Sequence, residues 1–309
     1  MRITRHHVAT VATAAALAGL AALSGPSPAI GATAITSDQG ATSSTARSAD
    51  RALRVVGLTD TGRLVSFAAS TPQRVRNLGR VQGLVGDKGL IGIDYRVQDG
   101  RLYGVGDSAG IYTVALGGRY PRAALVSRLT VPLSGTSFGV DFNPAANRLR
   151  VVSDTGQNLR HNIDDPAGAP AAGMTATDAS LTFPGPPSVP ATGVTAAAYT
   201  NNDLNTDTAT TLFDIDTTLD QVVVQSPANA GLLAPTGKLG IDAGSRAGFD
   251  IYSQQSRGAT VRNTGFATLA VSGRQTFHGV NVLTGDVTPI GTFRTGHQVV
   301  DIAVPLAQH

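Results

Sequence analysis

Four aspartates recur at equivalent places along the chain, and they are the residues that most directly suggest chemistry. Three of them close a glycine, apolar, aspartate triplet and the fourth closes a looser valine-rich copy; they are Asp94, Asp141, Asp250 and Asp301. Carboxylate oxygens brought together from repeated segments would suit a divalent cation such as calcium. The alternative is that each carboxylate accepts backbone N–H groups at a strand end or turn. We favour the structural role and keep the cation site as the second interpretation.

A polar turn from Ser153 to Arg160, with the sequence SDTGQNLR, occurs once in the chain. Its hydrogen-bonding side chains would suit a polar ligand, and the polar segment that begins at Asn201 has the same character. The residues that we predict to bind a ligand are Ser153, Asp154, Gln157, Asn158, Arg160, Asn201 and Asn202. The alternative is an ordinary polar turn whose side chains bond to the backbone.

The second of these polar segments also resembles a calcium loop in its spacing. Asp203, Asn205 and Asp207 alternate, and Asp214 falls at the twelfth position counted from Asp203. A calcium loop takes ligands at positions 1, 3, 5 and 12, but it needs glycine at position 6, where this chain has Thr208. We therefore predict no cofactor, with calcium as the alternative.

The chain offers no coherent set of catalytic residues. The segment GTSFG at 135–139 matches the nucleophile-elbow pattern, but that motif needs a helix after it, and the residues that follow predict a strand and a turn. Ser153, Asp154 and His161 are the residue types of a triad, yet residue types alone do not establish the required hydrogen-bonded geometry. The chain has no cysteine, and its histidines lack a zinc-binding spacing.

Three arginines cluster in the same part of the sequence: Arg148, Arg150 and Arg160. Arg148 and Arg150 share one face of a strand because side chains alternate with a period of two. They would clamp an anionic group or pair with Asp141 or Asp154 between neighbouring repeats. We favour the pairing.

The residues that would position these groups predict β-structure from Leu53 onward. Short apolar and β-branched runs alternate with glycine-containing turns, and no helical periodicity is found after the N-terminal segment. The glycine, apolar, aspartate segments recur at intervals of roughly 50 residues with about four strands each, which is typical of a β-propeller. We predict five blades, with six as the alternative.

The two ends of the domain complement each other. Gln298–Pro305 is a first strand with nothing after it, and Leu53–Arg80 holds later strands with no first strand before them. Pairing the two would complete one blade and close the ring without an exposed edge. The predicted blades are Val299–Leu306 with Leu53–Gln82, Gly89–Pro132, Phe138–Pro184, Gly193–Gly240 and Gly248–Phe293. Within the third, Asp164–Pro190 predicts a long surface excursion.

The N-terminal segment predicts export. Met1–Ala34 has a charged start, an apolar run and a small-residue cleavage site, as in a secretory signal peptide. Its apolar run, Val8–Leu23, is shorter than the ~20 residues of a spanning helix, and no twin-arginine pair is present. We expect a secreted, extracellular protein that uses the general secretory route, with residues 35–52 as a flexible leader and 53–309 as the propeller domain.

Charge and composition limit the partners. Removing the signal peptide takes two of the 24 basic residues and none of the 21 acidic ones, leaving a net charge of +1. No basic run is interleaved with aromatic residues, so we expect neither nucleic-acid binding nor membrane insertion. We predict a monomer whose partner is an extracellular small molecule, glycan or protein, although the absence of tryptophan weighs against stacking on sugars.

Several strings in the chain resemble the DUF4394 family, a group of secreted bacterial proteins of unknown function. They are GTSFGVDFNPAANRLRVVSDTGQNLRHN, AAYTNND, TTLFDID, GIDYR with RLYGV, and GFDIYS. The resemblance extends from about Gly57 to Pro305. It implies a propeller-like domain of unassigned activity and supplies no catalytic residues. We therefore expect a binding or scaffold module; the alternative is a propeller-type hydrolase or lyase with a site at one mouth of the axial channel.

Overall fold

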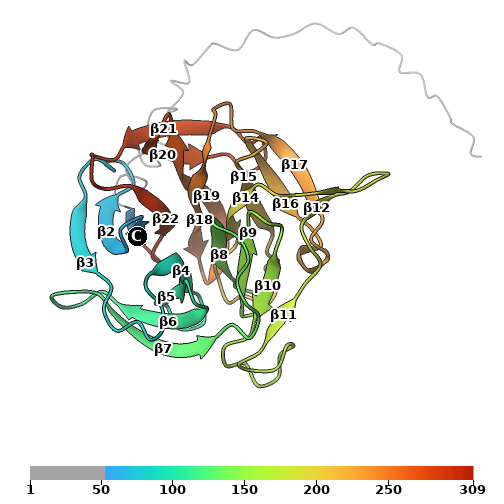
Figure 1. The fold of residues 1–309 in the computed structure, drawn as a ribbon, viewed down its shortest axis with the longest axis horizontal. Helices are drawn as coiled ribbons and strands as arrows, with labels where there is room; N and C mark the ends of the chain where they lie inside the picture. Colours follow the sequence, from blue (N-terminus) through green and yellow to red (C-terminus); the bar gives the residue numbers. More distant parts are fainter. Residues whose placement is uncertain (1–52, 309) are drawn as a thin grey trace, which may run out of the picture. The chain divides into compact units, whose positions relative to one another are not determined.

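The computed structural model describes residues 53–308, which form five four-stranded antiparallel sheets arranged around one axis (Figure 1). The predicted signal peptide (1–34), the predicted leader (35–52) and His309 lie outside the described residues. The prediction of an all-β propeller with five blades is confirmed, and the six-blade alternative is wrong.

Each blade begins with an inner strand at the axis, and in all blades but the fourth this strand carries one copy of the repeat. In chain order around the ring, starting from the blade that holds the C-terminus, these inner strands are β22 (Val299–Ala303), β4 (Leu90–Arg96), β8 (Phe138–Asn143), β14 (Val194–Tyr199) and β18 (Gly244–Ser256).

The other three strands of each blade follow outward in sequence order. They are β1 (Arg54–Thr59), β2 (Arg63–Ala68) and β3 (Arg76–Arg80) in blade 1; β5 (Arg101–Gly106), β6 (Gly110–Ala115) and β7 (Arg122–Arg128) in blade 2; β9 (Arg148–Ser153), β10 (Asn158–His161) and β11 (Thr175–Thr177) in blade 3; β15 (Leu212–Asp216), β16 (Gln221–Gln225) and β17 (Leu233–Lys238) in blade 4; and β19 (Ala259–Val271), β20 (Arg274–Val280) and β21 (Val287–Thr292) in blade 5.

The ring closes through the two ends of the domain, as the sequence predicts. β22 pairs antiparallel with β1, with Gly57 opposite Ile302. The neighbouring seam between blades 5 and 1 is filled by aromatic rings, and Phe67 meets Phe277 edge to face at a centroid distance of 5.2 Å. Edge-to-face pairs add to the stabilisation that burial of each ring already gives.

The glycines of the repeat let the inner strands approach one another. A Cβ on Gly139 would lie 2.6 Å from the backbone nitrogen of Ala197 in the next inner strand. A Cβ on Gly92 would lie 2.4 Å from Val140, and one on Gly248 would lie 2.4 Å from the Cα of Asp301. The repeated glycine is therefore required by close packing around the axis.

The apolar core is divided into five layers, each between two neighbouring blades. Successive residues of a strand alternate between the two layers on either side of its blade. In β9, for example, Val151 and Val152 lie in different layers. Both faces of each sheet are covered, so the strands are apolar on both sides.

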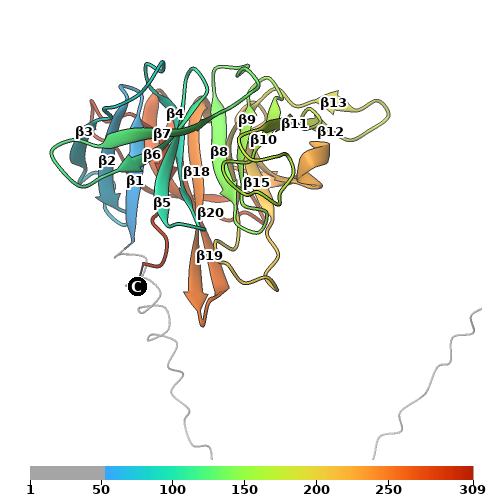
Figure 2. The same cartoon turned by 90° about the horizontal axis from the view of Figure 1, so that it is seen from below.

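Two segments depart from the regular blade. The predicted excursion Asp164–Pro190 contains β11, the short fourth strand of blade 3, and a hairpin of β12 (Thr182–Phe183) and β13 (Val189–Pro190). In blade 5, β18 and β19 have 13 residues each and extend beyond the ring on one side (Figure 2). Within residues 53–308 no helix has the length and hydrophobicity needed to cross a bilayer.

Candidate functional site

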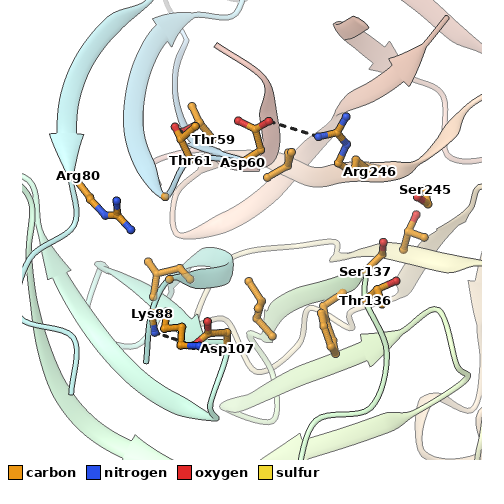
Figure 3. Close-up of a pocket in the computed structure, with 18 residues that line it drawn as sticks. Thr59, Asp60, Thr61, Arg80, Lys88, Asp107, Thr136, Ser137, Ser245 and Arg246 are labelled. Atoms are coloured by element: carbon orange, nitrogen blue, oxygen red, sulfur yellow. Dashed lines mark hydrogen bonds and ion pairs between the residues drawn. The ribbon is translucent and has the colours of Figure 1, made fainter. Parts of the chain in front are cut away.

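A hollow lies at the mouth of the ring where the inner strands begin. It has a volume of about 620 Å³, and all five blades contribute to its wall (Figure 3). We call it the axial funnel. Its position follows from the fold, because residues just before or at the start of every inner strand must meet at this end of the axis.

The wall of the axial funnel is rich in hydroxyl groups. They belong to Thr59, Thr61, Thr136, Ser137, Thr195 and Ser245. The hydroxyls of Thr59, Thr136 and Thr195 already donate hydrogen bonds within the protein, so they can only accept from a ligand. Among the described residues the hydroxyls of Ser137 and Ser245 have no partner, and each can donate to a ligand or accept from it.

The axial funnel also carries more positive than negative side chains. Arg246 forms an ion pair with Asp60, with Nη1 3.4 Å from Oδ2, across the seam between blades 5 and 1. The carboxylate of Asp107 accepts the backbone N–H of Lys88 at 2.9 Å. Among the described residues, the guanidinium of Arg80 and the ammonium of Lys88 have no hydrogen-bond or ion-pair partner. Two cationic groups are therefore available to an anionic ligand.

Sequence reasoning did not identify Arg80, Lys88 or Arg246 as site residues. Lys88 comes two residues before β4, and Arg80 ends β3. In a propeller, positions next to the start of an inner strand face the mouth of the ring. This rule could have identified the three residues from the sequence, but only if the start of each inner strand were known to within a residue or two.

The polar turn predicted to bind a ligand instead supports the wall of the axial funnel. Asp154 accepts the backbone N–H of Thr136 at 2.9 Å and its hydroxyl at 2.6 Å. Gln157 accepts the N–H of Ser134 and donates to the carbonyl of Pro132, each at 2.9 Å. These two side chains hold the segment that leads into β8.

The other residues of that turn lie elsewhere. Ser153 is buried, and its hydroxyl is 2.9 Å from that of Thr155. Asn158 is buried between blades 3 and 4, where it accepts from Arg150 at 2.6 Å. Arg160 holds both carboxylate oxygens of Asp178. The residues of the SDTGQNLR string therefore lie at two ends of blade 3 and do not line a single cavity.

Asn201 and Asn202 lie at the far end of β14, away from the axial funnel. The side chain of Asn202 donates to the carbonyl of Ile251 at 3.1 Å, and its backbone N–H donates to Ser253 at 2.9 Å. Asn201 exchanges hydrogen bonds with Asn263. Both asparagines thus fasten blade 4 to blade 5, and the structure does not bring them together with Ser153 and Asp154.

The calcium-loop spacing after Asn201 does not produce a common site. Asp203 accepts the N–H and the hydroxyl of Thr260, at 2.8 and 2.6 Å. Asp214, the residue at the twelfth position, lies in β15 and is fully buried. Asp207 lies in the loop before β15, where its backbone N–H donates a hydrogen bond to the side chain of Asn205.

The four repeated aspartates occupy equivalent places in the inner strands. Each accepts a backbone N–H from the inner strand of the following blade or, for Asp250, from the residue directly after that strand. The pairs are Asp301 with Ile93 at 2.7 Å, Asp94 with Phe142 at 2.8 Å, Asp141 with Tyr199 at 3.2 Å and Asp250 with Val304 at 2.5 Å. The structural role is therefore present, although the acceptor bonds cross between blades rather than close a local turn.

Blade 4 carries no aspartate at this position. Ala198 replaces it, directly before Tyr199. The seam from blade 4 to blade 5 depends instead on Asn202, whose bonds to Ile251 and Ser253 are described above. In blade 4, the contact that an aspartate makes in the other blades is therefore made by Asn202, further along the chain.

Three of the aspartates also lie close to one another. Asp94, Asp141 and Asp250 each offer one carboxylate oxygen, and these three oxygens all lie within 4.8 Å of one another. Burial, followed by repulsion from Asp250, raises the pKa of Asp94 well above its usual value. Burial, followed by repulsion from Asp94 and Asp250, does the same for Asp141. Burial raises the pKa of Asp250 to about 7. These carboxyl groups would hold protons or share a cation.

The three clustered arginines form ion pairs, but not with the predicted partners. Nη1 of Arg148 lies 3.0 Å from Asp165, and Nη1 of Arg150 lies 2.7 Å from Asp178. Arg160 shares Asp178 with Arg150. Pairing with Asp141 or Asp154 is therefore wrong. The actual partners come from the irregular segment after β10, whose path the sequence pattern does not predict.

The histidine nearest to the polar turn is part of the core. His161 lies between Ser127 and Thr175, with ring nitrogens 2.8 and 2.9 Å from their hydroxyls. Burial lowers its pKa to about 4. The GTSFG segment leads directly into β8, with no helix after it. The Ser127 hydroxyl is within reach of His161, but the other ring nitrogen meets the hydroxyl of Thr175 rather than a carboxylate, so the pair lacks the third member of a triad.

Comparison with solved structures finds matches of low similarity. A protein from Lactobacillus plantarum is 19% identical, with a TM-score of 0.35, over 79% of this chain and 67% of its own. A protein of unknown function from Bacteroides thetaiotaomicron is 10% identical, with a TM-score of 0.46, over 82% and 66%. Glutaminyl cyclase from Myxococcus xanthus is 14% identical, with a TM-score of 0.38, over 69% and 86%. This similarity assigns no activity.

Comparison with curated proteins finds no match. The model of one family, described as a domain of unknown function, matches residues 63–303, which include strands of all five blades. The match spans the inner strands with the repeated aspartates and the SDTGQNLR turn. The chain therefore belongs to the DUF4394 family.

Proposed function

We propose that this domain is an extracellular binding module that takes a small polar molecule with an anionic group in the axial funnel. The observation that carries the proposal is the pair of unpartnered cations, Arg80 and Lys88, in a hydroxyl-lined hollow of about 620 Å³. That volume falls in the usual range for small-molecule sites. A hydrogen bond to a charged group contributes about 1.5–3 kcal/mol, enough for two such groups to select an anion.

Titration calorimetry tests the proposal with a matched pair of probes. Glucuronate and glucose differ in a carboxylate, and citrate adds a second anionic probe. We expect saturable binding of an anionic probe, weakened at least tenfold in the Arg80→Gln/Lys88→Gln double variant and by added salt. Arg76→Gln, an exposed change on the same outer strand as Arg80, is the control. If neither anionic probe binds saturably, or if the double variant binds as well as the unmodified chain, the proposal fails.

The enzymatic alternative has less support at this mouth. Among the residues described, no histidine lines the axial funnel, and the hydroxyl of Ser137 has no base within hydrogen-bond reach. The two carboxylates there are engaged, Asp60 with Arg246 and Asp107 with the backbone of Lys88. A hydrolase or lyase would need a free acid–base pair.

A second candidate function is cation binding by Asp94, Asp141 and Asp250. Two oxygens bound to one calcium ion at about 2.3–2.6 Å lie at most about 5 Å apart, which matches the 4.8 Å limit among these carboxylates. We propose that calcium raises the midpoint of thermal unfolding at pH 7.5 and that a chelator lowers it. The variant Asp141→Asn removes the effect, whereas Asp301→Asn, which lies outside the close triplet, retains it. An unchanged midpoint with chelator would rule out the site.

A further inference from the structure

A second, smaller cavity lies between blades 3 and 4, near the end of β8 that is opposite the axial funnel. Its volume is about 140 Å³. The polar side chains that line it are Asn143, Arg148, Arg150, Arg160, Tyr199 and Asn229. We call it the arginine pocket. Small-molecule sites usually have at least about 300 Å³, so this pocket admits only a compact group.

The arginine pocket has one positive charge more than its ion pairs neutralise. Three guanidinium groups meet two carboxylates there: Arg148 pairs with Asp165, and Arg150 and Arg160 share Asp178. The side chains of Arg148 and Arg150 are only 6% and 3% exposed. Water therefore screens this charge poorly, and an additional anion would be held strongly.

Two further carboxyl groups face the same side of these blades, but among the described residues neither forms an ion pair with the three arginines. Asp141 lies opposite Arg150 in the neighbouring strand, where it accepts the N–H of Tyr199. Asp214 is buried and has no hydrogen-bond partner among the described residues. Burial raises the pKa of both, although the positive charge of Arg150 opposes this rise at Asp214.

The sheet itself places like charges side by side. Arg150 of β9 lies directly opposite Arg160 of β10 in the antiparallel register. Like charges in this position destabilise a sheet. Asp178 lies between them and accepts from both. Since one carboxylate serves two arginines, the pair retains capacity for a second anion.

The hydroxyl of Tyr199 is a further hydrogen-bond donor at the arginine pocket. The same hydroxyl accepts a hydrogen bond from Nε of Arg150 at 3.3 Å. The residue is 2% exposed, and among the described residues nothing accepts the hydrogen of its own O–H. Burial raises the pKa of this phenol, so it keeps that hydrogen. A buried donor without an acceptor is costly.

We propose that the arginine pocket binds a compact oxyanion, inorganic phosphate or sulfate. Such an ion accepts several hydrogen bonds at once from guanidinium groups and a phenol, and it would neutralise the excess charge. The bound ion would also stabilise the irregular segment of blade 3, because Arg148, Arg160 and the carbonyl of Ala169 meet at this pocket. The inference does not depend on the ligand of the axial funnel.

Titration calorimetry with phosphate, sulfate and chloride at equal ionic strength tests the proposal on the full domain prepared without phosphate or sulfate. We expect one saturable site for phosphate or sulfate and none for chloride. Arg160→Gln and Tyr199→Phe each weaken binding at least tenfold. Arg80→Gln, a change in the axial funnel, leaves the affinity unchanged. Circular dichroism checks each fold, and Arg160→Gln decides the outcome if Tyr199→Phe does not fold.

Three results would overturn the inference. One is the absence of saturable phosphate or sulfate binding by the unmodified chain. Another is equal affinity in Arg160→Gln, Tyr199→Phe and the unmodified chain. The third is loss of binding in Arg80→Gln alone, which would assign the oxyanion to the axial funnel and support the function proposed there instead.

Discussion

At the scale of single residues, the repeated glycine and aspartate perform two parts of one task. The glycine allows the next inner strand to approach, and the aspartate two residues later bonds to that strand's backbone. The recurrence of this pattern in the sequence correctly located the inner strands of blades 1, 2, 3 and 5, whereas β14 of blade 4 lacks both residues. It did not show that the bonds cross between blades, because the partner of an N–H group depends on how neighbouring repeats are placed.

Buried His161 predicts a specific sensitivity to acid. Burial lowers its pKa from 6.5 to about 4, so the unfolded chain binds a proton more readily than the folded one. Its contribution to the free energy of unfolding is complete above pH 6.5 and is lost as the pH falls toward 4. The shift corresponds to about 3 kcal/mol at most.

The matching measurement is urea unfolding at pH 7.5, 5.5 and 4.5. We expect the free energy of unfolding of His161→Asn to depend less on pH than that of the unmodified chain. His297→Asn, in a partly exposed turn before β22, should behave like the unmodified chain. Parallel curves for all three proteins would show that His161 does not titrate as proposed.

At the scale of elements, the inner strands are the least tolerant part of each blade. Gly139→Ala would place a Cβ 2.6 Å from the Ala197 nitrogen, and backbone cannot move aside as a side chain can. Overpacking of this kind typically costs about 1–3 kcal/mol, and we expect Gly139→Ala to reach the upper end of that range.

Gly279 in β20 provides a matched control. A Cβ there would meet nothing within 4 Å, and its backbone is not in the left-handed region. We expect Gly279→Ala to change the free energy of unfolding by less than about 0.5 kcal/mol. Chemical unfolding of both variants measures the difference. Equal losses would mean that approach of the inner strands does not limit stability.

The sequence predicts the strands of the regular blades better than those of the irregular ones. Blades 1, 2 and 5 follow the periodic pattern closely, although β18 begins at Gly244, four residues before the predicted start of its blade. In blade 3, the three-residue strand β11 is hidden in a segment rich in proline, alanine and glycine. Its pairing comes from tertiary contacts with β10, and local composition carries no signal for it.

The candidate sites illustrate the same limit. The sequence predicts that Asp154 and Gln157 bind a ligand, whereas the structure has them supporting the wall of the axial funnel rather than facing its interior. Arg80 and Lys88 look like ordinary surface charges in the sequence. They lie only eight residues apart in the sequence, but the hollow that they face is completed by residues of blades 3, 4 and 5 and forms only when the ring closes.

At the scale of the whole molecule, closure joins the first and last strands in one blade. β22 covers the inner edge of β1 and carries Asp301, which bonds to Ile93 of blade 2. A chain ending at Arg294 would lose that strand and leave the inner edge of β1 unpaired. We expect it to aggregate or to lose cooperative thermal unfolding, measured by calorimetry and light scattering.

Deletion of residues 185–188 is the control for that truncation. These residues form the exposed tip of the β12–β13 hairpin, outside the five sheets. We expect this deletion to leave the unfolding midpoint within a few degrees of the unmodified chain. Cooperative unfolding of the truncated chain at an unchanged midpoint would show that ring closure does not determine stability.

Closure by β22 also has a consequence for the order of events during biosynthesis. A ribosome delivers β1 first and its inner neighbour β22 last, some 240 residues later. Blades 2 to 5 can assemble in turn as they emerge, but blade 1 has to wait with an unpaired edge until β22 is made. The ring thus stays incomplete until β22 has been synthesised.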